Sequence, residues 1–140
     1  MNAIILLLCA VLRIASAAEP GERLVLNGKV FGLDGKPRAG AVLEVWHTDA
    51  SGLYRRDKGE GPARLRGIVR TDADGSYVVE TIKPGLYPGA KSGAHIHFKI
   101  DGGPTQTVFV DGGQPLLHFT RDAHGVLHAT HDFHLGGAAR

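Results

Sequence analysis

The sequence predicts an all-β fold, a single-domain β-sandwich of about seven to eight mostly antiparallel strands with little helix. Three observations support this prediction. The chain has 140 residues, a length that suits one domain. Its 20 glycines and 7 prolines interrupt any long helical run. Its apolar residues recur in short segments, and Gly, Asp and Pro turns separate these segments.

The first 18 residues are predicted to be a removable leader. Residues 3–12 form a short apolar run, and Ala15-Ser16-Ala17 then supplies the small residues that signal peptidase cleavage requires. The run is too short to span a bilayer, which takes about 20 apolar residues. We therefore expect a signal peptide over residues 1–18, a mature domain over residues 19–140, and a secreted or periplasmic protein without a transmembrane segment.

Composition excludes several classes of site. The one cysteine, Cys9, lies in the predicted leader, so the mature chain would hold neither a disulfide nor a thiolate metal site. The formal net charge is only +2, and no basic run interleaved with aromatic residues is present. Nucleic acid is therefore not an expected partner.

The first predicted strands precede a long loop. Residues 23–31 (RLVLNGKVF) mix β-branched and polar residues, as a strand does. Residues 32–37 (GLDGKP) have the composition of a turn. Residues 41–48 (AVLEVWHT) predict a second strand, which places Trp46 on one face and the next residue on the other. Residues 49–66 have no strand pattern, and a loop of this length is usually functional or mobile.

The second half of the chain predicts five further strands. Residues 67–71 and 76–81 are expected to form a hairpin around Asp-Ala-Asp-Gly, with Tyr77 as a structural residue among valines. Strands over residues 94–101 and 105–110 follow, and a last strand is expected over residues 130–135. No internal repeat or second domain is visible.

A His-x-His pair marks the candidate site. His95 and His97 share one face of their strand, so both imidazoles can point at one metal ion. Upstream, Tyr87 lies between two Pro-Gly pairs that stiffen and bend its loop. Histidines on one face are also common on ordinary half-polar sheets, so the pair by itself leaves metal binding open.

Two tyrosines in Gly-rich loops, Tyr54 and Tyr87, indicate which metal would suit the histidine pair. A phenol has a pKa of about 10, so it ionises at neutral pH only beside a strong cation. Phenolate is a hard anionic donor that suits ferric iron, Fe(3+), better than Zn(II) or Cu(I). An alternative is a cupin-like site of two histidines and Asp101 for Fe(II) or Mn(II), although Asp101 opens a turn and no second cupin motif follows.

From about residue 28 to residue 135, the chain resembles the intradiol ring-cleavage dioxygenases, the family of protocatechuate 3,4-dioxygenase and catechol 1,2-dioxygenase. The resemblance runs through GKVFGLDGKPRAGAVLEVWHTDASGLY, RGIVRTDADGSYVVETIKPGLYP, AHIHF and TQTVF. Order and spacing agree as well, because the Tyr-Pro loop precedes His-Ile-His. The resemblance implies a β-sandwich that opens catechol-type rings with Fe(III) and O2 to muconate-type diacids.

The resemblance also implies the roles of particular residues. It makes four side chains the iron ligands: Tyr54, Tyr87, His95 and His97. Among these, Tyr87 would be the axial ligand that leaves when substrate binds. Trp46 would line the substrate pocket, and Gln106 would lie near the reacting ring. The partners implied are a small catechol-type molecule and O2, and a homo-oligomer is left open.

The chain departs from the family pattern in the segment before His-Ile-His. The family usually has Arg-Pro-Ala there, whereas this chain has Ser92-Gly93-Ala94, with Lys91 next to the changed position. His47 also stands where the family often has Gln. Four arginines of the long loop either guide an anionic substrate such as a carboxylated catechol or are simply solvated: Arg55, Arg56, Arg64 and Arg66.

A second alternative is a protein without catalysis. Small β-sandwich modules of the transthyretin or carboxypeptidase-regulatory type share GKVFGLDGKPRAGAVLEV and TDADGSYVV with this chain. Such a module would act in binding or structure. It would not require two tyrosines and two histidines at the spacing of the dioxygenases, which is the feature that discriminates the two hypotheses.

Overall fold

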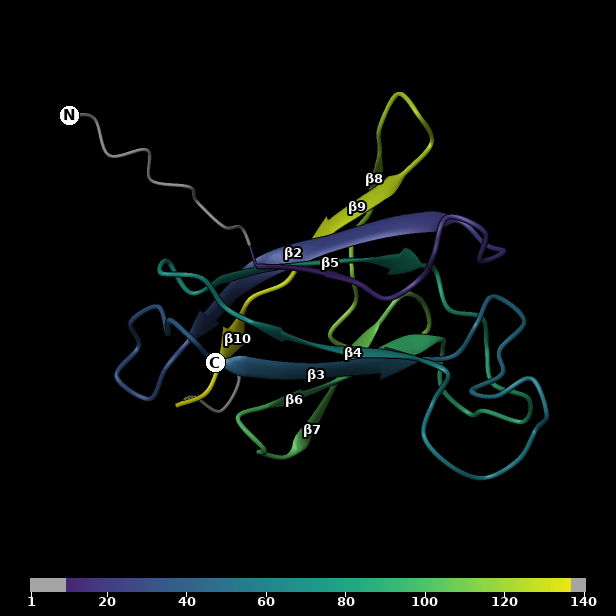
Figure 1. The fold of residues 1–140 in the computed structure, drawn as a ribbon, viewed down its shortest axis with the longest axis horizontal. Coiled ribbons are helices and arrows are strands. Elements are labelled where there is room, and N and C mark those ends of the chain that lie inside the picture. Colours follow the sequence, from purple (N-terminus) through teal and green to yellow (C-terminus); the bar gives the residue numbers. More distant parts are fainter. Residues whose placement is uncertain (1–9, 137–140) are drawn as a thin grey trace.

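The computed structural model describes residues 10–136 and shows two β-sheets packed face to face (Figure 1). One sheet has six strands in the order β1-β5-β2-β9-β8, with β10 also paired to β2, and the other has four in the order β4-β3-β6-β7. This confirms the all-β sandwich. Within the described residues, no helix is long and apolar enough to cross a membrane.

The strands of the six-stranded sheet are β1 (Val11–Arg13), β2 (Arg23–Phe31), β5 (Ser76–Ile82), β8 (Thr120–Arg121), β9 (Leu127–Thr130) and β10 (Phe133–His134). Those of the four-stranded sheet are β3 (Val42–His47), β4 (Leu65–Arg70), β6 (His95–Ile100) and β7 (Thr105–Phe109).

The core lies between the two sheets and follows the period of two that strands impose. From β2, the alternating side chains of Leu24 and Leu26 are buried. From β6, Ile96 and Phe98 enter the same core. Tyr77 is fully buried, and its hydroxyl donates a 2.7 Å hydrogen bond to the carbonyl oxygen of His131. Its predicted structural role is confirmed.

The predicted hairpin of residues 67–71 and 76–81 is wrong, because β4 and β5 belong to different sheets. The turn itself forms as expected. The Asp72 carboxylate accepts the backbone N–H groups of Asp74 and Ser76. After this turn, β5 pairs with β2, whereas β4 pairs with β3. Turn chemistry is the same for a hairpin and for a crossover between layers, so local sequence cannot separate them.

The predicted last strand is two short strands, β9 and β10, and both run parallel to β2. Between them, the His131 N–H donates to the Asn27 carbonyl, and the Asp132 carboxylate accepts the Lys29 N–H. Residues 127–134 thus run alongside β2 throughout, but the regular hydrogen bonding of the strand pair is interrupted between β9 and β10. Together with β1 on β5, these strands make three of the eight strand pairings parallel, more than the sequence indicated.

Part of the predicted leader belongs to the folded domain. β1 pairs in parallel with β5, and Ala15 is fully buried. The Arg23 guanidinium donates to the carbonyl oxygens of Ala15 and Ser16 at 2.9 and 2.8 Å. Cleavage after residue 17 or 18 would remove these contacts and uncover the edge of β5. Residues 1–9, with Cys9, lie outside the described residues, and leader removal stays a prediction.

His47 is a fully buried histidine on the core face of β3. Its Nδ1 lies 2.6 Å from the Thr48 carbonyl and therefore carries the proton, so its Nε2 accepts from the Thr81 hydroxyl at 2.7 Å. Burial lowers the pKa of His47 to about 4. The native imidazole is accordingly neutral at pH 5, where an unfolded histidine is protonated.

This difference predicts a pH-dependent stability. Below pH 6.5 the unfolded chain binds a proton that native His47 does not, so the free energy of unfolding falls as pH falls toward 4, by on the order of 3 kcal/mol for this group. Urea titrations between pH 7 and 4.5 should show a shallower fall in His47→Gln than in wild type. His124→Gln, at an exposed site, should keep the wild-type slope; equal slopes in all three proteins would contradict the role of His47.

Candidate active site

The two histidines lie on the outer face of the four-stranded sheet. In β6, Ile96 enters the core, so His95 and His97 point away from it, as the alternation predicts. His97 is opposite Trp46 of β3 and Thr107 of β7. The rings of Trp46 and His97 stack with centroids 5.2 Å apart.

Hydrogen bonds aim the free nitrogen of each imidazole at the same place. The Nδ1 of His95 lies 2.9 Å from the Gly93 carbonyl, to which it can only donate, so its Nε2 carries the lone pair. The Nδ1 of His97 lies 3.2 Å from the Thr107 hydroxyl. The two Nε2 atoms lie 3.1 Å apart. A partner on the far nitrogen is the arrangement that orients metal-ligating histidines.

Tyr54 contacts this pair directly, and Tyr87 lies against Tyr54. The Tyr54 hydroxyl lies 3.0 Å from Nε2 of His97. The rings of Tyr54 and Tyr87 have centroids 5.6 Å apart. Tyr87 remains 48% exposed, so it is the member of the cluster that can turn away without disturbing the core. The structure therefore brings together the four side chains that the sequence singled out, from two loops and one strand.

The electrostatics of the cluster favour a bound cation. Burial, and next the charge of His95, lowers the pKa of His97 to about 4, which leaves its lone pair free at neutral pH. Burial, and next the charge of Tyr87, raises the pKa of Tyr54. This phenol would thus ionise only if a strong positive charge stood beside it.

The spacing of the donor atoms fits one metal ion. Two ligands that each bind at about 2.1 Å and at a right angle lie about 3 Å apart. The two distances from His97 Nε2, 3.1 Å to His95 Nε2 and 3.0 Å to Tyr54 Oη, agree with this separation. Two phenols beside two imidazoles form a hard donor set that suits Fe(III).

An ion-pair network orders the loop that carries Tyr54. The Arg64 N–H donates to the Tyr54 carbonyl at 2.8 Å. Its guanidinium binds both carboxylate oxygens of Glu19 and approaches Asp49 at 3.4 Å. The bond from Arg64 is the main cause that lowers the pKa of Glu19. Because the Glu19 side chain is only 7% exposed, this loop is anchored to the domain rather than simply solvated.

Three of the four loop arginines have acidic neighbours. Arg64 binds Glu19, Arg55 binds Asp57 at 2.9 Å, and Arg56 lies 3.8 Å from Glu19. Arg66 forms no salt bridge within the described residues. Of these four arginines, Arg66 is therefore the one whose guanidinium is available to bind an anionic ligand.

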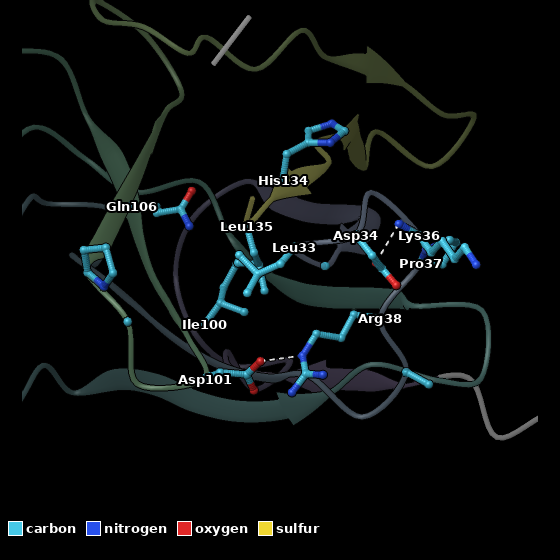
Figure 2. A pocket seen from close by; sticks show the side chains of 14 residues that line it. Leu33, Asp34, Lys36, Pro37, Arg38, Ile100, Asp101, Gln106, His134 and Leu135 are labelled. Atoms are coloured by element: carbon cyan, nitrogen blue, oxygen red, sulfur yellow. Dashed lines mark hydrogen bonds and ion pairs between the residues drawn. The ribbon is translucent and has the colours of Figure 1, made fainter. Parts of the chain in front are cut away.

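Gln106 does not lie at the site. It pairs with Phe98 and therefore shares the core-facing side of β6, opposite to the histidines. Figure 2 shows Gln106 beside a different cavity, of about 1010 Å³, which Ile100, His134 and Leu135 also line. Its expected place near the reacting ring is wrong, and Thr107 stands beside His97 instead. A shift of one residue in register exchanges the two faces of a strand, and sequence spacing across a turn cannot fix that register.

The cupin-like alternative also fails on geometry. Asp101 accepts the Val42 N–H and the Arg38 guanidinium with its two carboxylate oxygens, at the opposite end of β6 from His95. Across residues 10–136, no three His, Cys, Asp or Glu side chains form a group that could hold a metal ion. A metal at this face needs the tyrosines.

A cavity of about 560 Å³ adjoins the cluster. Trp46, Tyr54 and Tyr87 line it, together with Lys58 and other residues of the long loop. Trp46 thus borders a cavity that both tyrosines line, as expected of a residue at a substrate pocket, although neither His95 nor His97 lines this cavity. Ser92, at the position of the family arginine, is exposed in the connection between Tyr87 and β6.

Comparison with known proteins agrees with this geometry. The dioxygenase family model Dioxygenase_C matches residues 9–124, a match that begins within the predicted leader. Catechol 1,2-dioxygenase 2 of Acinetobacter lwoffii is 38% identical over 105 residues, which cover 63% of this chain and 38% of that protein. The protocatechuate 3,4-dioxygenase beta chain of Burkholderia cepacia is 38% identical over 119 residues, or 72% of this chain and 50% of that one.

A solved structure of similar size exists. The dioxygenase domain of a dioxygenase–carbohydrate-binding protein fusion from Streptomyces sp. SirexAA-E superposes with a TM-score of 0.73 and 33% identity, covering 92% of this chain and 90% of that one. By contrast, this chain spans only 38% to 50% of the length of the two curated relatives above. The matched residues and the shared fold together show that the chain belongs to the intradiol ring-cleavage dioxygenase family.

Proposed function

We propose that this chain is an Fe(III)-dependent intradiol dioxygenase that cleaves a catechol-type ring with O2. The observation that carries the proposal is the convergence of His95 Nε2, His97 Nε2 and Tyr54 Oη within 3.0–3.1 Å contacts, beside the ring of Tyr87. The reaction balances as one catechol plus one O2 giving one muconate-type diacid, with both oxygen atoms retained in the product.

The four side chains would hold the metal as two imidazoles and two phenolates. When bound, Fe(III) supplies Lewis acidity that withdraws electron density from the catechol oxygens and activates the ring toward O2. The lowered pKa of His97 keeps its Nε2 unprotonated for this task at neutral pH. The Gly93 carbonyl and the Thr107 hydroxyl hold the two rings in their ligating orientation.

Tyr87 would act as a proton acceptor. A catechol that binds as a dianion would have to give up its hydroxyl protons, and Oη of Tyr87 would take one of them. Tyr87 suits this role because it is half-exposed on a loop between two Pro-Gly pairs, whereas Tyr54 contacts His97 and its loop is anchored through Arg64. Trp46, stacked on His97, offers a flat apolar wall to the substrate ring.

The test is an absorption spectrum of the purified protein loaded with Fe(III), followed by addition of catechol. We expect visible charge-transfer colour from the tyrosinates, a shift of that colour on adding catechol, and catechol-dependent O2 uptake. If the protein retains iron and shifts colour but consumes no O2, it binds iron and catechol but the proposed ring cleavage is contradicted. A colourless protein that does not retain iron would favour the non-catalytic binding module.

A further inference from the structure

The outer face of the four-stranded sheet continues beyond the four-residue cluster. Strand register puts His97, Trp46 and Arg66 side by side on β6, β3 and β4. The neighbouring rung, two residues along each strand, holds Lys99, Glu44 and Ile68. A second cavity, of about 610 Å³, lies over this rung and shares Trp46, Pro62 and Ala63 with the cavity beside the tyrosines.

The two cavities adjoin along Trp46, Pro62 and Ala63, and together they are called the groove below. Trp46 stands where the cavities meet, and Ile68 beyond it is 61% exposed, high for an isoleucine in a strand. A single exposed isoleucine is ordinary on a protein surface, but Ile68 lines the same cavity as Trp46, so an apolar part of a ligand in that cavity would cover both side chains. The four-residue cluster would bind only the ring of a catechol. The side chains of Trp46 and Ile68 are therefore available to contact a substituent on that ring.

The charges of the groove favour an anion at its far wall. Lys99 and Glu44 occupy directly opposite positions on β6 and β3, where opposite charges attract, although they form no salt bridge within the described residues. Arg66 is opposite Trp46 instead, is exposed, and has no salt-bridge partner within the described part of the chain. A free guanidinium can bind a carboxylate through two parallel hydrogen bonds.

The geometry points to a catechol that carries an apolar arm ending in a carboxylate as the substrate class, an inference that rests on the proposed ring cleavage. The ring faces the tyrosines and histidines, the arm lies over Trp46 and Ile68, and the carboxylate meets Arg66. Because β6 and β4 flank β3, His97 and Arg66 stand two strand spacings apart, about 10 Å. A ring plus a spacer of two or three carbons spans this distance.

Three catechols test the inference on Fe(III)-loaded protein: catechol, 3-(3,4-dihydroxyphenyl)propanoate and the matching neutral propanamide. Dissociation constants come from the colour shift. We expect the propanoate to bind about two- to fivefold more tightly than the propanamide, the upper part of the range for an exposed ion pair. Arg66→Gln should abolish this preference and leave the affinity for catechol unchanged. Arg70→Gln, on the same face of β4 but farther from Trp46, should keep it.

A second readout does not depend on iron. In the metal-free protein, the propanoate should shift the indole N–H signal of Trp46, the one tryptophan, at concentrations where Arg66→Gln shows no shift. If catechol fails to shift the colour of iron-loaded protein, the proposed function fails. If catechol binds but the propanoate and the propanamide have equal affinities, in wild type as in Arg66→Gln, the proposed ring cleavage stands. The proposed site for the carboxylate-bearing arm is then overturned. Dimers that dissociate in Ile68→Ser, with no discrimination between arms, would also overturn it and assign the face to a second copy.

Discussion

His97→Ala should lower the affinity for Fe(III) by on the order of 100-fold or more and abolish the visible colour. The reason is the central place of this residue, because its Nε2 lies 3.1 Å from Nε2 of His95 and 3.0 Å from the Tyr54 hydroxyl. Tyr54→Phe, Tyr87→Phe and His95→Ala each remove one donor and should also lose iron. Iron content after dialysis, normalised to protein, is the measurement.

Two matched substitutions serve as controls for the ligand variants. Tyr77→Phe removes a buried hydroxyl on the six-stranded sheet, which should cost about 1 kcal/mol of stability because the His131 carbonyl loses its donor, yet leave iron content intact. His131→Ala removes an imidazole that packs on Phe133, away from the cluster. Equal iron content in all six variants would refute the assignment of the site.

Gly52→Ala should separate the two tyrosine loops. Gly52 belongs to the Tyr54 loop, has φ of +88°, and lies so close to the loop before Tyr87 that an added Cβ would stand 2.0 Å from the Leu86 carbonyl oxygen. The backbones must move apart to admit a methyl group. We expect stability to fall by about 2–3 kcal/mol and iron affinity by at least about tenfold, since Tyr87 would no longer reach the shared point. Urea unfolding and iron titration measure the two effects.

Gly89→Ala is the matched control for this substitution. Gly89 follows Tyr87 by two residues and also has a positive φ, +79°, but an added Cβ would meet nothing within 4 Å. The free energy of unfolding of Gly89→Ala should therefore fall only by the cost of an alanine in the left-handed conformation, about 1 kcal/mol. The variant should bind iron as wild type does. If Gly52→Ala retained iron as well as Gly89→Ala, close contact between the loops would not be needed for the site.

Local chemistry in the sequence determined the class of fold and the set of candidate ligands. Alternation of apolar residues defines β2, β3 and β6 because a strand exposes its two faces in turn, whatever it pairs with. The same alternation places His95 and His97 together without knowledge of the remaining chain. Phenol and imidazole chemistry, with the family pattern, then selected Tyr54 and Tyr87 from the three tyrosines.

Tertiary structure decided everything that depends on pairing across long distances in the chain. The register of β7 against β6 puts Thr107, and not Gln106, on the face that carries the histidines. A shift of one residue would turn each of these side chains to the other face. The placement of β4 and β5 in different sheets and the pairing of β1 with β5 likewise depend on which strands become neighbours in the fold. The sequence of a short segment does not specify its neighbouring strand. Arg66 stands out only because the folded chain gives its three neighbouring arginines acidic partners.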